Sequence, residues 1–308
     1  MKVARPFLDM SKLVERNQSP RSGSLTGAPA LAVQFFLIPL AVVAAIGGIY
    51  LGFRMLVADQ RSAQEYLGDV RTGGRERQWP AAYELSRLLA DPEVERNEPG
   101  LGAALVQAFE GSADGDPRVR RYLAMAIGRL KAPPDGAVPA LLKGARDDDS
   151  ETAISAVWAL GSLGSPAAVP ALEELYDSDD AGVRKMVVYA LGAVSGEEQL
   201  STLRRALDDP AVDVQWNAAV ALSRHGDESG VPVLRRMLDR VYVERVMTRT
   251  PSGGADVDMA ADVIISGIQA VMALRDTSLR ESVQVLSQSD DSLRVRQAAL
   301  EALKHIGT

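Results

Sequence analysis

The stretch AVPAL occurs at residues 137–141 and again at residues 168–172. The leucine that closes it recurs at a constant interval of 31 residues along the chain. This leucine column consists of Leu141, Leu172, Leu203 and Leu234. Internal repetition with a period of roughly 20 to 50 residues is typical of stacked structural repeats, so the sequence predicts a repeat array.

One unit of the array, residues 116–149, has the pattern of two helices. Asp116 followed by proline is typical of a helix start, and apolar residues recur at helical spacing from there to Leu130. PPDG at residues 133–136 breaks the chain, and a shorter apolar stripe follows. A helical hairpin cannot bury its apolar stripes alone. We therefore predict an all-α protein, an α-solenoid of about six to seven helical hairpins over residues 79–308.

The first helix of each unit shares a pattern. V-R-x-x-A-x-x-A-L-G, read at residues 183–192, resembles the short HEAT-like repeats of the phycobilin-lyase type. The same template fits four further stretches and, loosely, a fifth: residues 119–128, 152–161, 214–223, 295–304 and 263–272. Because proteins with such repeats usually hold other macromolecules, the resemblance implies a protein-protein interaction scaffold without catalytic activity and without a cofactor.

Enzymes that share this repeat provide the alternative, an accessory or lyase-like enzyme acting on a bound prosthetic group or a modified protein. Deoxyhypusine hydroxylases of this fold bind iron through paired His-Glu motifs, whereas the two histidines here, His225 and His305, are not followed by glutamate. The chain has no cysteine and no serine-hydrolase, P-loop or zincin motif. We therefore expect no catalytic, cofactor-binding or metal-binding residue.

Charge is distributed unevenly. The net charge is −7, yet the N-terminal tail, residues 1–29, is basic, so the rest of the chain is more acidic than the total indicates. An acidic body repels phosphate backbones. The composition therefore argues against nucleic acid as a partner.

An uncharged apolar run extends from Ala30 to Phe53, and about 20 such residues suffice to cross a bilayer as a helix. We therefore predict a transmembrane helix over residues 30–56, followed by a juxtamembrane spacer over residues 57–78. This would make the chain a single-pass protein of a bacterial cell membrane, and the basic tail weakly favours an extracytoplasmic solenoid. Small residues recur every fourth position in the run, which predicts a possible homodimer through this helix. They are Ala44, Gly48 and Gly52.

Aspartates cluster before several first helices, as in DDD at residues 147–149. DSDDAG at residues 177–182 resembles the start of a calcium loop, but alanine and valine stand at later ligand positions. Carboxylates also cap free N–H groups at helix starts. We therefore expect a structural role, with Arg120, Arg184 and Arg296 pairing with these aspartates.

Two features exceed what folding requires. The positions after the leucine column hold arginine pairs on two successive second helices, which in such solenoids commonly line the concave, ligand-bearing surface. The second feature is an insertion at residues 241–258, which adds two more arginines and in which the second helix should continue to Met247. We therefore predict a binding surface for a protein partner with an acidic surface. Its residues are Arg204, Arg205, Arg235, Arg236, Arg245 and Arg249.

Overall fold

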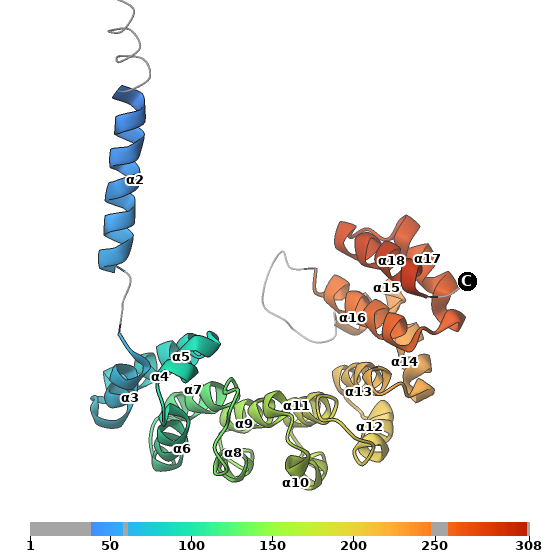
Figure 1. Ribbon diagram of the computed structural model, residues 1–308. Coiled ribbons are helices and arrows are strands. Elements are labelled where there is room, and N and C mark those ends of the chain that lie inside the picture. The colour runs from blue at the N-terminus through green and yellow to red at the C-terminus, as the bar shows by residue number, and fades with distance from the viewer. Residues whose placement is uncertain (1–37, 58–60, 248–257, 307–308) are drawn as a thin grey trace, which may run out of the picture. The chain divides into compact units, whose positions relative to one another are not determined.

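The computed structural model describes residues 38–57, 61–247 and 258–306 (Figure 1). The chain divides after Gln60 into two compact units, and all the secondary structure in the described residues is helical. The helices are α2 (Ile38–Val57), α3 (Ala63–Thr72), α4 (Arg75–Leu88), α5 (Pro92–Asn97), α6 (Leu101–Gly111), α7 (Pro117–Ile127), α8 (Ala137–Gly144), α9 (Ser150–Leu163), α10 (Val169–Leu175), α11 (Ala181–Leu191), α12 (Leu200–Arg205), α13 (Val212–Arg224), α14 (Val231–Met237), α15 (Arg240–Met247), α16 (Met259–Leu274), α17 (Arg280–Ser289) and α18 (Leu293–His305).

The first unit contributes α2, which corrects the prediction of a membrane span. The described helix covers Ile38–Val57 and contains Arg54. No helix in the described parts of the chain is long and apolar enough to cross a membrane. The predicted single-pass location in the cell membrane is therefore wrong. The predicted helix over residues 30–56 is not supported as a membrane span, and residues 30–37 lie outside the described residues.

The small residues of α2 are Ala44, Gly48 and Gly52, and all three are exposed. A Cβ atom added to Gly48 or to Gly52 would meet no heavy atom within 4 Å. Among the described residues nothing packs against this side of the helix, so the structure does not support the predicted homodimer.

The second unit, residues 61–308, contains the repeats. The first helices α7, α9, α11 and α13 pack side by side, and each is followed by a shorter second helix, α8, α10, α12 or α14 (Figure 1). The helix α16 continues the first row with α17 as its second helix, and α18 packs against both. The described residues thus form an all-helical repeat solenoid, as predicted.

The two rows differ in spacing. Neighbouring first helices contact each other extensively, whereas α8, α10, α12 and α14 contact one another only weakly. Because the more closely packed row of a curved stack lies on its inner side, the first helices occupy that side. The expectation that second helices line the concave surface is therefore not met.

The core follows the predicted period. Leu141, Leu172, Leu203 and Leu234 are fully buried. The buried apolar residues form two clusters, one extending from Ala63 to Leu222 and the other from Trp216 to Ile306, and both include residues of α13. The leucine column is therefore confirmed as part of the core.

Two segments differ from their predicted boundaries. In the region predicted as a spacer, α3 buries Tyr66, Leu67 and Val70 in the first core cluster, and α4 already begins at Arg75. Residues 61–78 therefore belong to the compact repeat unit. In the insertion, α14 ends at Met237 and a separate helix, α15, begins at Arg240 rather than the second helix continuing.

Candidate functional site

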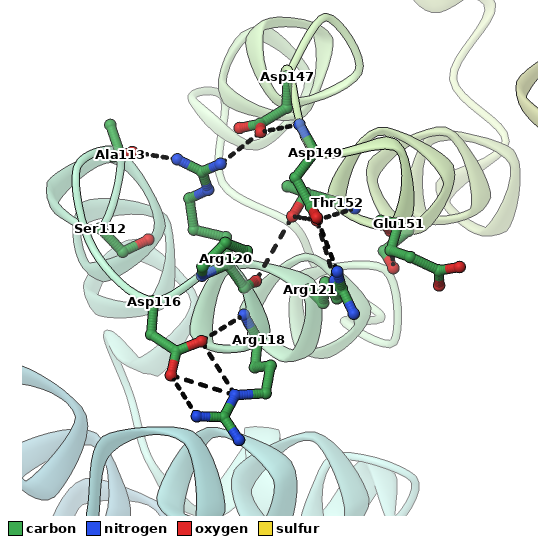
Figure 2. Close-up of polar contacts among 12 residues, drawn as sticks. Ser112, Ala113, Asp116, Arg118, Arg120, Arg121, Asp147, Asp149, Glu151 and Thr152 are labelled. Carbon is green, nitrogen blue, oxygen red and sulfur yellow. Dashed lines mark hydrogen bonds and ion pairs between the residues drawn. The ribbon is translucent and has the colours of Figure 1, made fainter. Parts of the chain in front are cut away.

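Arginines of α7 connect this helix to the next hairpin (Figure 2). The Arg120 guanidinium donates to the backbone oxygen of Ala113 and to the carboxylate of Asp147. Its neighbour Arg121 donates to both carboxylate oxygens of Asp149, at 2.9 Å from Nε and 2.7 Å from Nη2. Asp149 also accepts a hydrogen bond from the backbone N–H of Thr152 at 2.8 Å and so caps α9. The loop between α8 and α9 thus forms two ion pairs with α7, through Asp147 and Asp149, and Asp149 also caps α9.

A similar link appears further along the array. Arg184 of α11 donates to the two carboxylate oxygens of Asp209 at 2.9 and 3.0 Å. The hydroxyl of Tyr176 donates to the same carboxylate at 2.9 Å, and the Asp209 side chain is only 2 % exposed. Burial alone would raise the pKa of Asp209, but the hydrogen bonds from Arg184, Ala211 and Tyr176 outweigh it and lower the pKa. Burial, followed by this hydrogen bond, raises the pKa of Tyr176 to about 12.

These contacts confirm the capping role of the aspartates. Asp116, Asp149 and Asp180 each accept a backbone hydrogen bond at the start of a first helix. The predicted pairing with aspartate is confirmed for Arg120 and Arg184, whereas Arg296 donates to backbone oxygens. No group of three or more His, Asp or Glu side chains in the described ranges is arranged to hold a metal ion. The aspartate clusters are therefore explained by structure.

The second-helix arginines are exposed, but two of them have carboxylate partners. Arg204 Nε donates to Asp227 at 2.8 Å, and Arg205 Nη2 donates to Asp177 at 3.0 Å. Asp227 lies in the turn between α13 and α14, and Asp177 lies in the loop between α10 and α11, so the two arginines contact segments on either side of their own hairpin. They are therefore largely neutralised within the chain.

On the next second helix, Arg235 is exposed and has no polar partner among the described residues. Arg236 donates to Gln215 at 3.2 Å and stacks over the Tyr242 ring. In the insertion, Arg245 lies on α15, and Arg249 lies outside the described residues. Of the arginines of this surface that the structure describes, Arg235 on α14 is thus the one that no polar partner holds.

Sequence reasoning missed a surface on the first helices. The exposed side of α4 meets that of α7, where the rings of Tyr83 and Tyr122 lie 5.1 Å apart at 71°. The Arg118 guanidinium lies 4.8 Å from the Trp79 ring, which joins the same two helices. We name the four aromatic residues at this surface, together with the three arginines that lie against their rings, the aromatic–arginine cluster. Its members are Trp79, Tyr83, Arg87, Arg118, Tyr122, Arg129 and Trp158.

The cluster extends to a third helix and reaches solvent. Arg129, in the turn that follows α7, lies 5.9 Å from the Trp158 ring of α9, and Arg87 lies 5.7 Å from the Tyr83 ring. Tyr83 is 38 % exposed although it is a large aromatic residue. Arginines on aromatic faces keep their planar groups ordered. Within the chain, Arg118 also donates to Asp116, Arg87 to Glu84 and Arg129 to the backbone oxygen of Ser86. A sequence signal existed, because Trp79, Tyr83 and Arg87 are each four residues apart and therefore share one face of α4.

Comparisons with known proteins agree with this geometry. A family model of HEAT repeats matches residues 102–192 and 177–247. The stretch from residue 102 to residue 247 is thus similar to HEAT repeats. No curated protein matches the chain.

Solved structures add to the likeness in fold. The complex of CpcE and CpcF of phycocyanin lyase from Nostoc sp. PCC7120 is 19 % identical, with a TM-score of 0.50, and the match covers 82 % of this chain and 97 % of that chain. A designed armadillo repeat protein in complex with the peptide (KR)4 is 18 % identical over 79 % of this chain and 98 % of that one, with a TM-score of 0.42. Human deoxyhypusine hydroxylase in complex with glycerol is also 18 % identical, over 87 % and 99 %, with a TM-score of 0.34. At these identities the likeness concerns the fold alone, which does not decide between binding and catalysis.

Proposed function

We propose that the HEAT-like solenoid is a scaffold that binds another protein through the aromatic–arginine cluster. The observation that carries the proposal is the contact of tyrosine, tryptophan and arginine side chains across α4, α7 and α9. Tyr83, Arg87 and Arg118 are exposed, and the other members are half-buried. Tyrosine, tryptophan and arginine are the residues most enriched where single side chains dominate protein–protein affinity. They lie on the closely packed row, whose helices hold them in fixed positions.

The test is a double variant, Tyr83→Ala with Arg87→Glu. Both side chains reach solvent, so the melting temperature should change little, while recovery of the bound protein from a cell extract should fall at least about tenfold. Arg224→Glu is the matched control, because it reverses one exposed arginine on α13 that belongs to neither proposed surface. Equal recovery of the same partners by the double variant and the parent would refute the proposal.

The second-helix arginines remain a second proposed surface, for a partner with acidic side chains. Arg235 supports it, since an exposed guanidinium without a partner can bind a carboxylate bidentately. Arg204 and Arg205 already hold aspartates, so their contribution should be smaller than that of Arg235 and Arg236. Binding that depends on this surface should weaken with added salt and with Arg235→Glu but not with Tyr83→Ala. Binding that is insensitive to salt would exclude it.

The alternative of an accessory or lyase-like enzyme makes a different prediction. Such a protein should copurify with a prosthetic group or a modified protein, visible by absorbance or by intact-mass measurement. Purified protein that carries no such group, together with loss of partner binding in the double variant, would favour the scaffold.

A further inference from the structure

In α18, one side of the helix is exposed to solvent. The five earlier first helices that match the template bury the equivalent side. In the template, the second position holds Arg120, Arg184 and Arg296. One nitrogen of Arg184, Nη1, donates to the backbone oxygens of Ser178 and Asp179, and the other two hold the Asp209 carboxylate of the next hairpin. Arg120 likewise binds a backbone oxygen behind it and an aspartate ahead. The arginine therefore joins its own loop to the loop of the following repeat.

Arg296 makes only the first half of this link. Its Nη1 donates to the backbone oxygens of Asp290 and Asp291, the positions equivalent to those used by Arg184. Its Nε and Nη2 have no partner among the described residues. The backbone oxygens thus hold the guanidinium in place, and the side that binds a carboxylate elsewhere in the array is open.

Apolar side chains flank this open guanidinium. The sixth template position is at most 2 % exposed in five earlier first helices, where it is Ala124, Val157, Val188, Ala219 or Ile268. In α18 the same position is Leu300, which is 50 % exposed, and Leu293 is 74 % exposed. Leu293, Arg296 and Leu300 are three and four residues apart and therefore share one face of the helix. Among the described residues, nothing covers these two leucines.

We infer that this face of α18 docks a helical hairpin of another protein that presents a carboxylate in the loop before its helix. The links from Arg120 to Asp147 and from Arg184 to Asp209 show the chemistry that fills the equivalent face inside the array. The leucines would bury against the incoming helix, and the carboxylate would bind the open edge of Arg296 bidentately.

A second copy of α18 fits this face poorly. In a symmetric antiparallel pair the leucines of one helix would meet those of the other. Arg296 lies close to midway between Leu293 and Leu300, so two guanidinium groups would then face each other near the symmetry axis. Like charges at the centre of a buried contact are unfavourable. The occupant is therefore expected to carry the opposite charge.

The experiment places a photo-reactive amino acid, p-benzoylphenylalanine, at exposed Gln297 beside Arg296 in the full chain and irradiates the cells that produce it. We expect crosslinks to the loop and first helix of a hairpin in a different protein, identified by mass spectrometry of the joined peptides. The same probe at Gln269, which is exposed on α16, is the control for random contact. Crosslinks to a second copy of the chain, or none, would overturn the inference.

Charge reversal then tests the carboxylate. Arg296→Glu should lower the crosslink yield about tenfold or more, and changing the partner's aspartate to arginine should restore it. Leu300→Glu should lower the crosslink yield as well. Because this variant keeps the backbone contacts of Arg296, a lower yield in it cannot come from a folding defect caused by loss of those contacts. An unchanged yield in both variants would refute the inference. Tyr83→Ala with Arg87→Glu should leave these crosslinks intact, so this surface and the proposed function can fail separately.

Discussion

The helices of the first half of the array are held together differently from those of the second half. From α7 to α13 a glycine of each first helix lies directly against an alanine of the next, at Gly128 and Ala159, Gly161 and Ala190, and Gly192 and Ala221. A Cβ atom added to Gly161 would lie 2.7 Å from the Cα atom of Ala190, and real Cβ atoms do not approach so closely. Glycine therefore allows the backbones of the first helices to touch.

From α13 onward the repeats lack this glycine. The last position of the template, which is glycine in the first half, is occupied by Ser223, Met272 and Lys304. A buried ion pair connects the elements instead. Arg240 at the start of α15 donates to both carboxylate oxygens of Asp290 at 2.9 and 2.7 Å, and Asp290 is 1 % exposed. The hydrogen bonds that Arg240 donates to Asp290 raise the pKa of Arg240 above its usual value and keep it charged. The first half thus combines close backbone contacts with ion pairs between neighbouring repeats, whereas the second half lacks the glycine contact and has an ion pair between residues 50 apart in the chain.

The largest effect is expected from Asp290→Ala. It leaves the buried guanidinium of Arg240 without its main partner, which should lower the free energy of unfolding by about 3–5 kcal/mol. Denaturant titration measures the loss, and amide hydrogen exchange should locate it in α15–α18 rather than in α7–α11. Asp262→Ala removes an exposed ion pair with Arg294 and should cost no more than about 1 kcal/mol. Similar losses in the two variants would mean that the buried pair does not hold this half together.

Leu172→Ala tests the regular half. It deletes a fully buried side chain of the leucine column and should cost about 2–5 kcal/mol through lost burial and the cavity that remains. Exchange protection should fall first in α9–α12. The control is Val241→Ala, which shortens an exposed side chain on α15 and should cost far less. An unchanged melting temperature for Leu172→Ala would place Leu172 outside the core.

Gly161→Ala examines the backbone contact itself. The added methyl group must push α11 away from α9, which should cost about 1–3 kcal/mol. Gly68→Ala is the matched control, because Gly68 lies inside α3 and a Cβ there meets nothing within 4 Å. That substitution should be neutral or stabilise by up to about 1 kcal/mol, since alanine favours helix. If both substitutions raised the free energy of unfolding, a methyl group would fit between α9 and α11, and the backbone contact would not be tight.

The sequence predicted the repeat, the leucine column and the aspartate caps because these depend on residues close together in the chain. Burial of Leu172 follows from a period, and capping by Asp149 involves residues only three apart. Contacts between repeats were harder to predict. Arg204 and Arg205 form an arginine pair in the sequence, but their carboxylates are 23 and 28 residues away, and only the fold shows them to be partners.

Two further differences between prediction and structure concern the aromatic–arginine cluster and the apolar run near the N-terminus. Stacking of Tyr83 on Tyr122 requires two helices that are joined through α5 and α6, so no local pattern reveals it. The apolar run at residues 30–53 predicted a membrane span from composition alone, whereas α2 begins only at Ile38. Length measured along the sequence exceeded the length of the described helix.

The smallest effect is expected from pH, and it concerns the aspartates that link the regular repeats. Hydrogen bonds lower the pKa of Asp209 in the folded protein below its value of about 3.9 in the unfolded chain. The unfolded state then binds the proton more readily, so the stabilisation is complete above that unfolded value and is lost as pH falls through the folded pKa. Asp209→Asn should reduce the slope of unfolding free energy against pH below about pH 4 by at most one proton, about 1.4 kcal/mol per pH unit. Asp177→Asn, at an exposed aspartate bonded to Arg205, is the control, and equal slopes for the two variants would show that the buried link does not contribute to acid sensitivity.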